Sequence, residues 1–201
     1  MLLSRLKLPR GPLKLEESQG AAAVGTGLAL GAEFAELAQG LGSFTGAERR
    51  FQRLGERGGV LVVDDYAHHP TEIAATLAAA RGAFPDRRIV IAFQPHLFTR
   101  TRDFAREFGV ALAAADAVYL TEIYPARERP IEGVTSALVA DALSAAGGRL
   151  AWRGTREELP AALAAQVLPG DVVLTVGAGD VTKVGPVLLE ELGRPHAEAR
   201  R

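Results

Sequence analysis

Short apolar segments rich in β-branched residues alternate with longer segments of helical periodicity from residue 58 onward. Buried strands are expected at 58–66, 87–95, 116–124, 150–152 and 170–179, and helices at 70–84, 99–115, 134–146, 155–167 and 181–192. Strands that alternate with helices in this way form right-handed βαβ crossovers. The pattern therefore predicts an α/β fold, Rossmann-like, with a mainly parallel sheet and helices on both faces.

The first 48 residues lack this alternation. Residues 1–20 contain two prolines and no clear period, so we expect a poorly ordered arm there. Residues 21–42 are rich in Ala, Gly and Leu, and we expect one or two short helices despite the glycines. We accordingly divide the chain into an arm with a short helical segment, 1–48, and an α/β domain, 49–201.

Composition excludes several classes of function. The 201 residues contain no Cys, which excludes disulfide scaffolds, thiolate metal sites and cysteine nucleophiles. Lys and Arg number 23 against 24 Asp and Glu, a net charge of -1, so binding to nucleic acid or to an anionic membrane is not expected. No run approaches the length of about 18 apolar residues that a membrane-spanning helix needs. We expect a cytoplasmic protein.

In parallel sheets, ligands bind beyond the carboxyl ends of the strands. The first loop there, DDYAHHPTE at 64–72, holds two carboxylates and two imidazoles. Such groups can perform acid–base chemistry or bind a metal, whereas Asp64 and His69 could instead cap and brace the turn. A metal hydrolase using Asp64, Asp65, His68 and His69 is one hypothesis, although adjacent histidines in an extended segment point in different directions.

Three further loops lie at the same edge. In FQPHLFTRTRD (93–103), Arg100 opens a helix whose free N–H groups already favour an anion, while Arg102 points elsewhere and could pair with Glu107. The long loop TEIYPARERPIEG (121–133) could form a rim or lid. GAGDVTKVG (177–185) is a partial G-x-G-x-x-G pattern, but no strand follows it with the acidic residue of a dinucleotide site. Its glycines either let backbone approach a ligand or only form a tight turn.

Four motifs in this order, DDYAHHPTE, FQPHLFTRTRDF, EIYPARERPIEG and GAGDVTK, resemble the C-terminal domain of the Mur ligase family. The similarity is greatest to the branch that joins L-alanine to UDP-N-acetylmuramate, and it extends over about residues 28–192. Upstream, GSFTGAERRFQRLGE is similar to the end of that family's central domain and its hinge. The resemblance implies that 1–48 contains a helical remnant of the central ATP-binding domain and that 49–201 is the C-terminal domain.

The resemblance also implies an activity, ATP-dependent amide bond formation assisted by Mg ions in peptidoglycan precursor synthesis. His68 would lie near the reacting centre and the incoming amino acid, and Arg100 would pair with the L-alanine carboxylate. The implied nucleotide contacts are Arg50, Asp65 and Tyr66, and the implied border of the amino-acid site is Gly177, Gly179 and Asp180. No metal ligand is assigned to this chain, because the family holds ATP and Mg mainly through its central domain.

The sequence departs from the family at its beginning. It contains no G-x-x-G-K-[ST] phosphate loop, and LEESQ at 15–19 stands where the family has His-Asn-x-x-Asn. Some relatives carry Arg where this chain has Leu97. We therefore expect a truncated ligase that is inactive alone and that could work with a separate chain carrying the missing domains. A non-catalytic nucleotide- or amino-acid-binding module is the alternative. The related ligase that attaches a preformed peptide also stays open, although Tyr66 favours the L-alanine branch.

Overall fold

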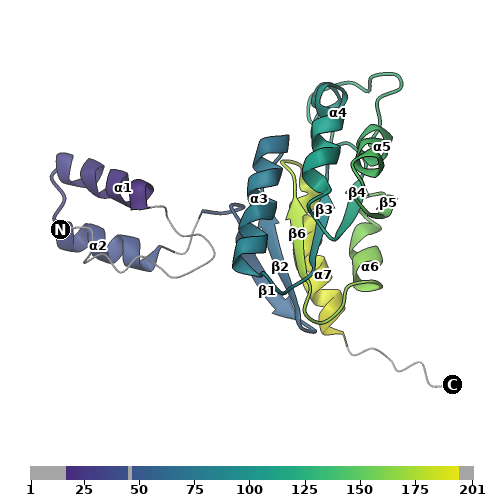
Figure 1. The fold of residues 1–201 in the computed structure, drawn as a ribbon. Coiled ribbons are helices and arrows are strands. Elements are labelled where there is room, and N and C mark those ends of the chain that lie inside the picture. Colours follow the sequence, from purple (N-terminus) through teal and green to yellow (C-terminus); the bar gives the residue numbers. More distant parts are fainter. Residues whose placement is uncertain (1–16, 45–46, 195–201) are drawn as a thin grey trace. The chain divides into compact units, whose positions relative to one another are not determined.

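The computed structural model describes residues 17–44 and 47–194 (Figure 1). The chain divides into two compact units between Glu48 and Arg49. The first contains helices α1 (Glu17–Ala29) and α2 (Phe34–Ser43), as the sequence predicts for this region. The arm expected at 1–20 lies outside the described residues up to residue 16. No helix in the described ranges combines the length and apolar character needed to cross a membrane.

The second unit is an alternating α/β domain. Its elements are β1 (Gln52–Arg57), β2 (Val60–Asp65), α3 (Pro70–Ala83), β3 (Ile89–Phe93), α4 (Phe98–Leu112), β4 (Ala117–Thr121), α5 (Ala137–Ala145), β5 (Leu150–Gly154), α6 (Leu159–Ala164), β6 (Val172–Val176), a 3-10 turn η2 (Asp180–Lys183) and α7 (Val184–Gly193). They form one six-stranded sheet in the order β1-β2-β6-β3-β4-β5, in which only β1 is antiparallel. The predicted α/β fold with a mainly parallel sheet is confirmed.

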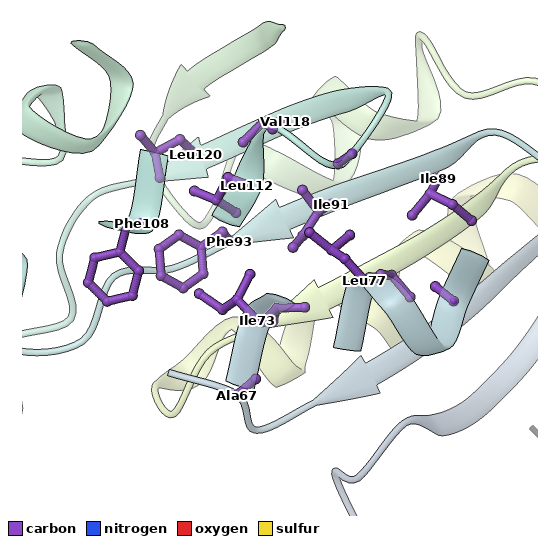
Figure 2. Close-up of a cluster of buried hydrophobic side chains, with 14 of the residues drawn as sticks. Ala67, Ile73, Leu77, Ile89, Ile91, Phe93, Phe108, Leu112, Val118 and Leu120 are labelled. Carbon is purple, nitrogen blue, oxygen red and sulfur yellow. The ribbon is translucent and has the colours of Figure 1, made fainter. Parts of the chain in front are cut away.

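Both faces of the sheet are covered. One core layer packs α3, α4 and α5 against the sheet, and Figure 2 shows Phe93, Ile73 and Phe108 within it. The other layer packs α6 and α7 against the opposite face, around Leu163 and Leu188. Strands β2, β3, β4 and β6 are buried at every residue for this reason, which explains their continuous apolar sequence.

The register of the sheet aligns the carboxyl ends of β2, β3 and β6, the edge at which ligands bind in parallel sheets. Val176 at the end of β6 pairs with Asp65 at the end of β2 and with Phe93 at the end of β3. The three strands therefore finish level with one another. The loops that follow them emerge side by side at the carboxyl edge of the sheet.

The structure differs from the sequence-based elements at two places. The sequence does not predict strand β1, because QRLGER is polar and lacks a β-branched run; the strand forms through main-chain pairing to β2. The helix expected over 155–167 is only Leu159–Ala164. The Thr155 and Glu158 side chains do bond, with Oγ1 2.8 Å from Oε2, but they close a turn before the helix, which begins beside Pro160.

Helices α4 and α5 pack tightly at Gly109, and this contact leads to a prediction about stability. A Cβ placed on Gly109 would lie 2.4 Å from the carbonyl carbon of Ala142 and 2.5 Å from the nitrogen of Leu143. Backbone atoms cannot rotate away, so Gly109→Ala should force the helices apart and cost about 1–3 kcal/mol. A thermal unfolding scan should show a lower Tm.

Gly82→Ala is the matched control. Gly82 lies in α3, and its Cβ would meet nothing within 4 Å. Ala there should leave the free energy of unfolding unchanged or raise it by up to about 1 kcal/mol, so Tm should not fall. Equal Tm values for the two variants would contradict the packing argument.

Candidate functional site

Main-chain hydrogen bonds join the loops at the carboxyl edge. The Gly177 N–H donates to the Asp65 carbonyl (3.1 Å), and the Gln94 N–H donates to the Val176 carbonyl (3.0 Å). The loops after β3 and β4 exchange two more bonds, from Tyr124 N–H to the Pro95 carbonyl (2.8 Å) and from Leu97 N–H to the Tyr124 carbonyl (2.9 Å). Four loops distant in sequence thus form one continuous surface.

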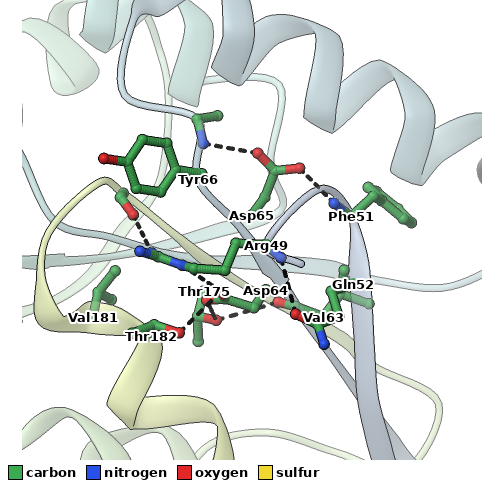
Figure 3. A network of polar contacts seen from close by, with 12 residues as sticks. Arg49, Phe51, Gln52, Val63, Asp64, Asp65, Tyr66, Thr175, Val181 and Thr182 are labelled. Atoms are coloured by element: carbon green, nitrogen blue, oxygen red, sulfur yellow. Dashed lines mark hydrogen bonds and ion pairs between the residues drawn. The ribbon is translucent and has the colours of Figure 1, made fainter. Parts of the chain in front are cut away.

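Asp64 is the buried anchor of this surface (Figure 3). Its fully buried carboxylate accepts hydrogen bonds from Arg49 Nε (2.9 Å), Thr175 Oγ1 (2.7 Å) and Thr182 Oγ1 (3.1 Å). The same Arg49 side chain donates from Nη2 to the Gly177 carbonyl (2.5 Å) and lies 4.8 Å from the centre of the Tyr66 ring. We call Arg49, Asp64, Thr175 and Thr182 the Asp64 clamp. The ion pair of Arg49 and Asp64 in this clamp is structural, so Asp64 braces the turn, as one of the sequence-based alternatives predicts.

Asp65 is also committed to the fold. Its two carboxylate oxygens accept the N–H groups of Phe51 and Ala67, both at 2.8 Å. Burial raises the pKa of Asp65 above its ordinary value, although these two N–H bonds oppose the rise. Next to it, Tyr66 is half-buried, and the exposed Arg50 guanidinium lies 5.9 Å from its ring centre. Arg50 and Tyr66 thus offer a cation beside an aromatic face, whereas Asp65 mainly shapes the loop.

The two histidines of the first loop have different roles. His69 caps α3, where its side chain accepts from Thr71 N–H and the Glu72 carboxylate closes a capping box. His68 Nδ1 lies 3.0 Å from the Tyr66 carbonyl and 3.4 Å from Glu72 Oε2. Both of these oxygens are acceptors, so Nδ1 carries a hydrogen in this arrangement, and in the neutral ring the lone pair is on Nε2. Burial opposes ionisation of Glu72, but the N–H groups of His68 and His69 hold its pKa below the ordinary value.

Arg100 reaches His68 through a third histidine. Nη1 of Arg100 lies 3.3 Å from His96 Nδ1, and the rings of His96 and His68 are 6.0 Å apart. The ring of His96 also stacks on Tyr124 at 5.7 Å. Guanidinium can only donate, so Nδ1 of His96 accepts and its Nε2 carries the hydrogen. Burial, together with the positive charge of Arg100, lowers the pKa of His96 and favours the neutral ring.

The glycine loop after β6 packs against protein. A Cβ on Gly177 would lie 2.8 Å from the Gln94 carbonyl oxygen, and one on Gly179 would lie 2.3 Å from Gln94 Oε1 and 2.6 Å from the Tyr124 ring. Gln94 donates to Asp180 Oδ1 (2.8 Å) and accepts from Val181 N–H (3.0 Å). The glycines therefore permit close contact between loops, and Asp180 ties two of them together.

The predicted residues fall into three neighbouring groups. His68 and Arg100 share one cluster, joined by His96 and Tyr124. Arg50 and Tyr66 form a second beside Asp65, and it adjoins the first because the ring centres of Tyr66 and His68 are 5.3 Å apart. Asp180 lies in a third, with Gln94 and with Arg156, whose Nε is 3.4 Å from its Oδ2.

Two sequence-based hypotheses do not survive the geometry. Arg102 pairs with its chain neighbour Asp103 (2.7 Å) and not with Glu107. The two neighbouring side chains are both exposed near the start of α4 and can contact each other there. In the described part of the chain, no three His, Asp or Glu side chains gather to hold a metal ion, so the hydrolase hypothesis lacks its site.

Sequence reasoning missed four residues of this edge, namely Arg49, Gln94, His96 and Tyr124. Their position in the loops that follow β3 and β4 is a usable signal for Gln94, His96 and Tyr124. Arg49 carried no such signal, because its partners Asp64 and Gly177 are distant in sequence.

Known proteins resemble this chain over most of its length. A UDP-N-acetylmuramate–L-alanine ligase from Cutibacterium acnes is 55% identical over 179 residues, which cover 89% of this chain and 38% of that ligase. The ligase of the same name from Streptomyces griseus is 53% identical over 171 residues, 85% of this chain and 37% of the relative. The chain thus spans less than two fifths of the length of these curated relatives.

Solved structures show the same architecture. The UDP-N-acetylmuramate–alanine ligase of Thermotoga maritima superposes with a TM-score of 0.70 at 29% identity, over 86% of this chain and 36% of the ligase. A domain from a UDP-N-acetylmuramate:L-alanyl-gamma-D-glutamyl-meso-diaminopimelate ligase of Haemophilus ducreyi matches with a TM-score of 0.56 at 25% identity, over 71% of this chain and 99% of that domain. A family profile described as "Mur ligase, glutamate ligase domain" matches residues 49–179, more than half of the sequence. This chain belongs to the Mur ligase family.

Proposed function

We propose that the chain supplies the C-terminal domain of an ATP-dependent UDP-N-acetylmuramate–L-alanine ligase, which forms an amide bond in peptidoglycan precursor synthesis in the cytoplasm. The observation that carries this proposal is the 55% identity to the ligase of that name over 89% of the chain. In this account residues 49–201 are the C-terminal domain and residues 1–48 contain the end of the central ATP-binding domain. The other domains would be supplied elsewhere in the same protein or by a separate chain.

The cluster around Arg100 suits recognition of an amino acid. The Arg100 guanidinium would pair with the carboxylate of L-alanine, since this fork matches a carboxylate. His68 Nε2 has a lone pair and would accept a proton from the alanine ammonium, which leaves the amine free to attack the activated lactyl carboxylate. His96, with its hydrogen on Nε2, would donate to an oxygen in the same space. Gly177, Gly179 and Asp180 would border this site by positioning Gln94 and Tyr124.

Nucleotide contacts from this domain would be limited to the outer part of ATP. Arg50 and Tyr66 offer a cation and an aromatic face, and Asp65 would lie beside them with its carboxylate already bonded to two main-chain N–H groups. ATP would supply the phosphoryl group that activates the carboxylate. Mg²⁺ would be held mainly by the central domain, since no three acidic or histidine side chains converge in the described ranges of this chain.

A non-catalytic module that binds a nucleotide or an amino acid is the second candidate. It is favoured by the internal use of the Asp65 and Asp180 carboxylates, which already bond to groups of this chain. The two candidates differ in whether the domain supports ligation when the remaining domains are present.

A chimera provides the deciding experiment. Residues 49–201 would replace the corresponding part of the Cutibacterium acnes ligase, and L-alanine-dependent ADP release would be measured. We expect activity, and we expect Arg100→Gln to lower kcat/KM for L-alanine about 10- to 100-fold, because a charge-assisted bond of about 1.5–3 kcal/mol is lost. Arg102→Gln, which changes an exposed arginine paired with Asp103, is the matched control and should match the parent. A folded but inactive chimera would favour the non-catalytic module.

The neutral state of His96 gives a second prediction. NMR titration of the 201-residue chain should show His96 with a pKa below the ordinary value of about 6.5. Between the pKa of His96 in the folded chain and its ordinary pKa in the unfolded chain, His96 binds more protons in the unfolded state. Its contribution to the free energy of unfolding should therefore rise with pH in that window and decline as pH falls. Arg100→Gln should raise the His96 pKa by removing a nearby positive charge, and Arg102→Gln should not. An unchanged pKa in Arg100→Gln would show that the two side chains are not in contact.

A further inference from the structure

We propose that a second ligand site lies at the carboxyl ends of β4 and β5 and binds an α-amino acid zwitterion with a large apolar side chain. The site is a cavity of about 530 Å³, a volume typical of small-molecule sites. Its walls include Phe98, Glu122, Ile123, Val134, Ser136 and Arg153. This inference goes beyond the proposed ligase function, which uses the neighbouring Arg100 cluster.

Opposite charges face this cavity without neutralising each other. Glu122 follows β4 directly, and Arg153 is in β5, which pairs with β4 in parallel. Both residues line the cavity and are exposed to solvent, and neither is among the ion pairs found between described residues. A ligand with one positive and one negative group can satisfy both, whereas a singly charged ligand leaves one of them facing its own sign or unpaired.

A buried hydroxyl marks the anionic end of the ligand. Ser136 is only 6% exposed and lines the cavity, but it makes no capping bond at the start of α5. Thr135 takes that role, since its Oγ1 accepts from Ala137 N–H at 3.2 Å. The Ser136 hydroxyl is not among the buried side-chain atoms without a partner in the described residues, so it is open to solvent from the cavity and available to a ligand. Together with the start of a nine-residue helix and the Arg153 guanidinium, Ser136 forms a receptor for a carboxylate.

The rest of the cavity is apolar and already formed. Phe98, Ile123 and Val134 supply its apolar wall, which suits a side chain larger than the methyl group of alanine. The loop that carries Val134 is held against α4, because Glu128 Oε2 accepts from Thr99 N–H at 2.9 Å. A binding site that is formed in advance does not have to be ordered by its ligand.

Tyr124 separates this cavity from the Arg100 cluster. Glu122 and Ile123 line the cavity, whereas the next residue, Tyr124, stacks its ring on His96. The two sites therefore use different side chains of the same loop. Ligand binding in the cavity can be distinguished from binding at the cluster by the residues whose signals respond.

NMR titration of the 201-residue chain with L-phenylalanine tests the proposal. We expect saturable shifts of the amides at 122–123, 134–136 and 153–154, with millimolar or tighter affinity. N-acetyl-L-phenylalanine amide, which lacks both charges, should give no saturable shifts. Arg153→Gln should weaken binding at least about tenfold, and Ser136→Ala should weaken it less, since it removes one neutral hydrogen bond. Arg106→Gln, at an exposed position outside the cavity, should bind like the parent.

Three results would overturn the proposal. One is the absence of saturable shifts in the folded parent chain. Another is equal binding of the uncharged analogue, which would show a merely apolar pocket. The third is a response confined to His68, His96 and Arg100, which would place the ligand at the Arg100 cluster. That last result would support amino-acid binding at the proposed ligase site while removing the second site, so the two proposals can fail separately.

Discussion

Asp64 places a fully buried carboxylate at the end of β2, and side chains from three other segments converge on it. A buried charge is tolerated only when it is paired and fully hydrogen-bonded, so the groups around Asp64 are constrained together. Arg49 transmits this constraint outward, because it also binds the Gly177 carbonyl and lies over Tyr66. The positions of the loops after β2 and β6 thus depend on Arg49, which contacts neither Arg100 nor His68.

Arg49 has a conformation that only such a network maintains. Its φ is 55°, in the left-handed region that costs a non-glycine residue about 1–3 kcal/mol. Phe51 has a φ of 50° and is held by the Asp65 carboxylate through its N–H. The chain therefore enters its α/β unit through two strained residues, each held by an acidic residue at the end of β2. Stability of the domain and placement of the edge loops have the same origin.

The sequence predicts the layers of this fold better than its contacts. Buried strands such as VLVVDD are recognisable because both faces of the sheet are covered, which requires continuous apolar runs. Strand β1 escapes prediction because an edge strand needs only main-chain pairing. Within the site, the sequence predicts that Arg100 lies in the first turn of a helix and that His69 caps a turn, and the structure has both features. The roles of Arg49 and His96 do not follow from the sequence, because they arise from partners brought together by the sheet order β2-β6-β3-β4.

The central claim is that the Asp64 clamp positions the carboxyl-edge loops, and hydrogen exchange of single amides tests it most directly. In Arg49→Met, the side-chain bonds to Asp64 and to Gly177 are lost while the apolar stem remains. We predict faster exchange of the Gly177 amide, whose bond to the Asp65 carbonyl would open more often, while amides of β3 and β4 keep their protection. Unchanged exchange at Gly177 would contradict the claim, as would a uniform loss of protection across the sheet.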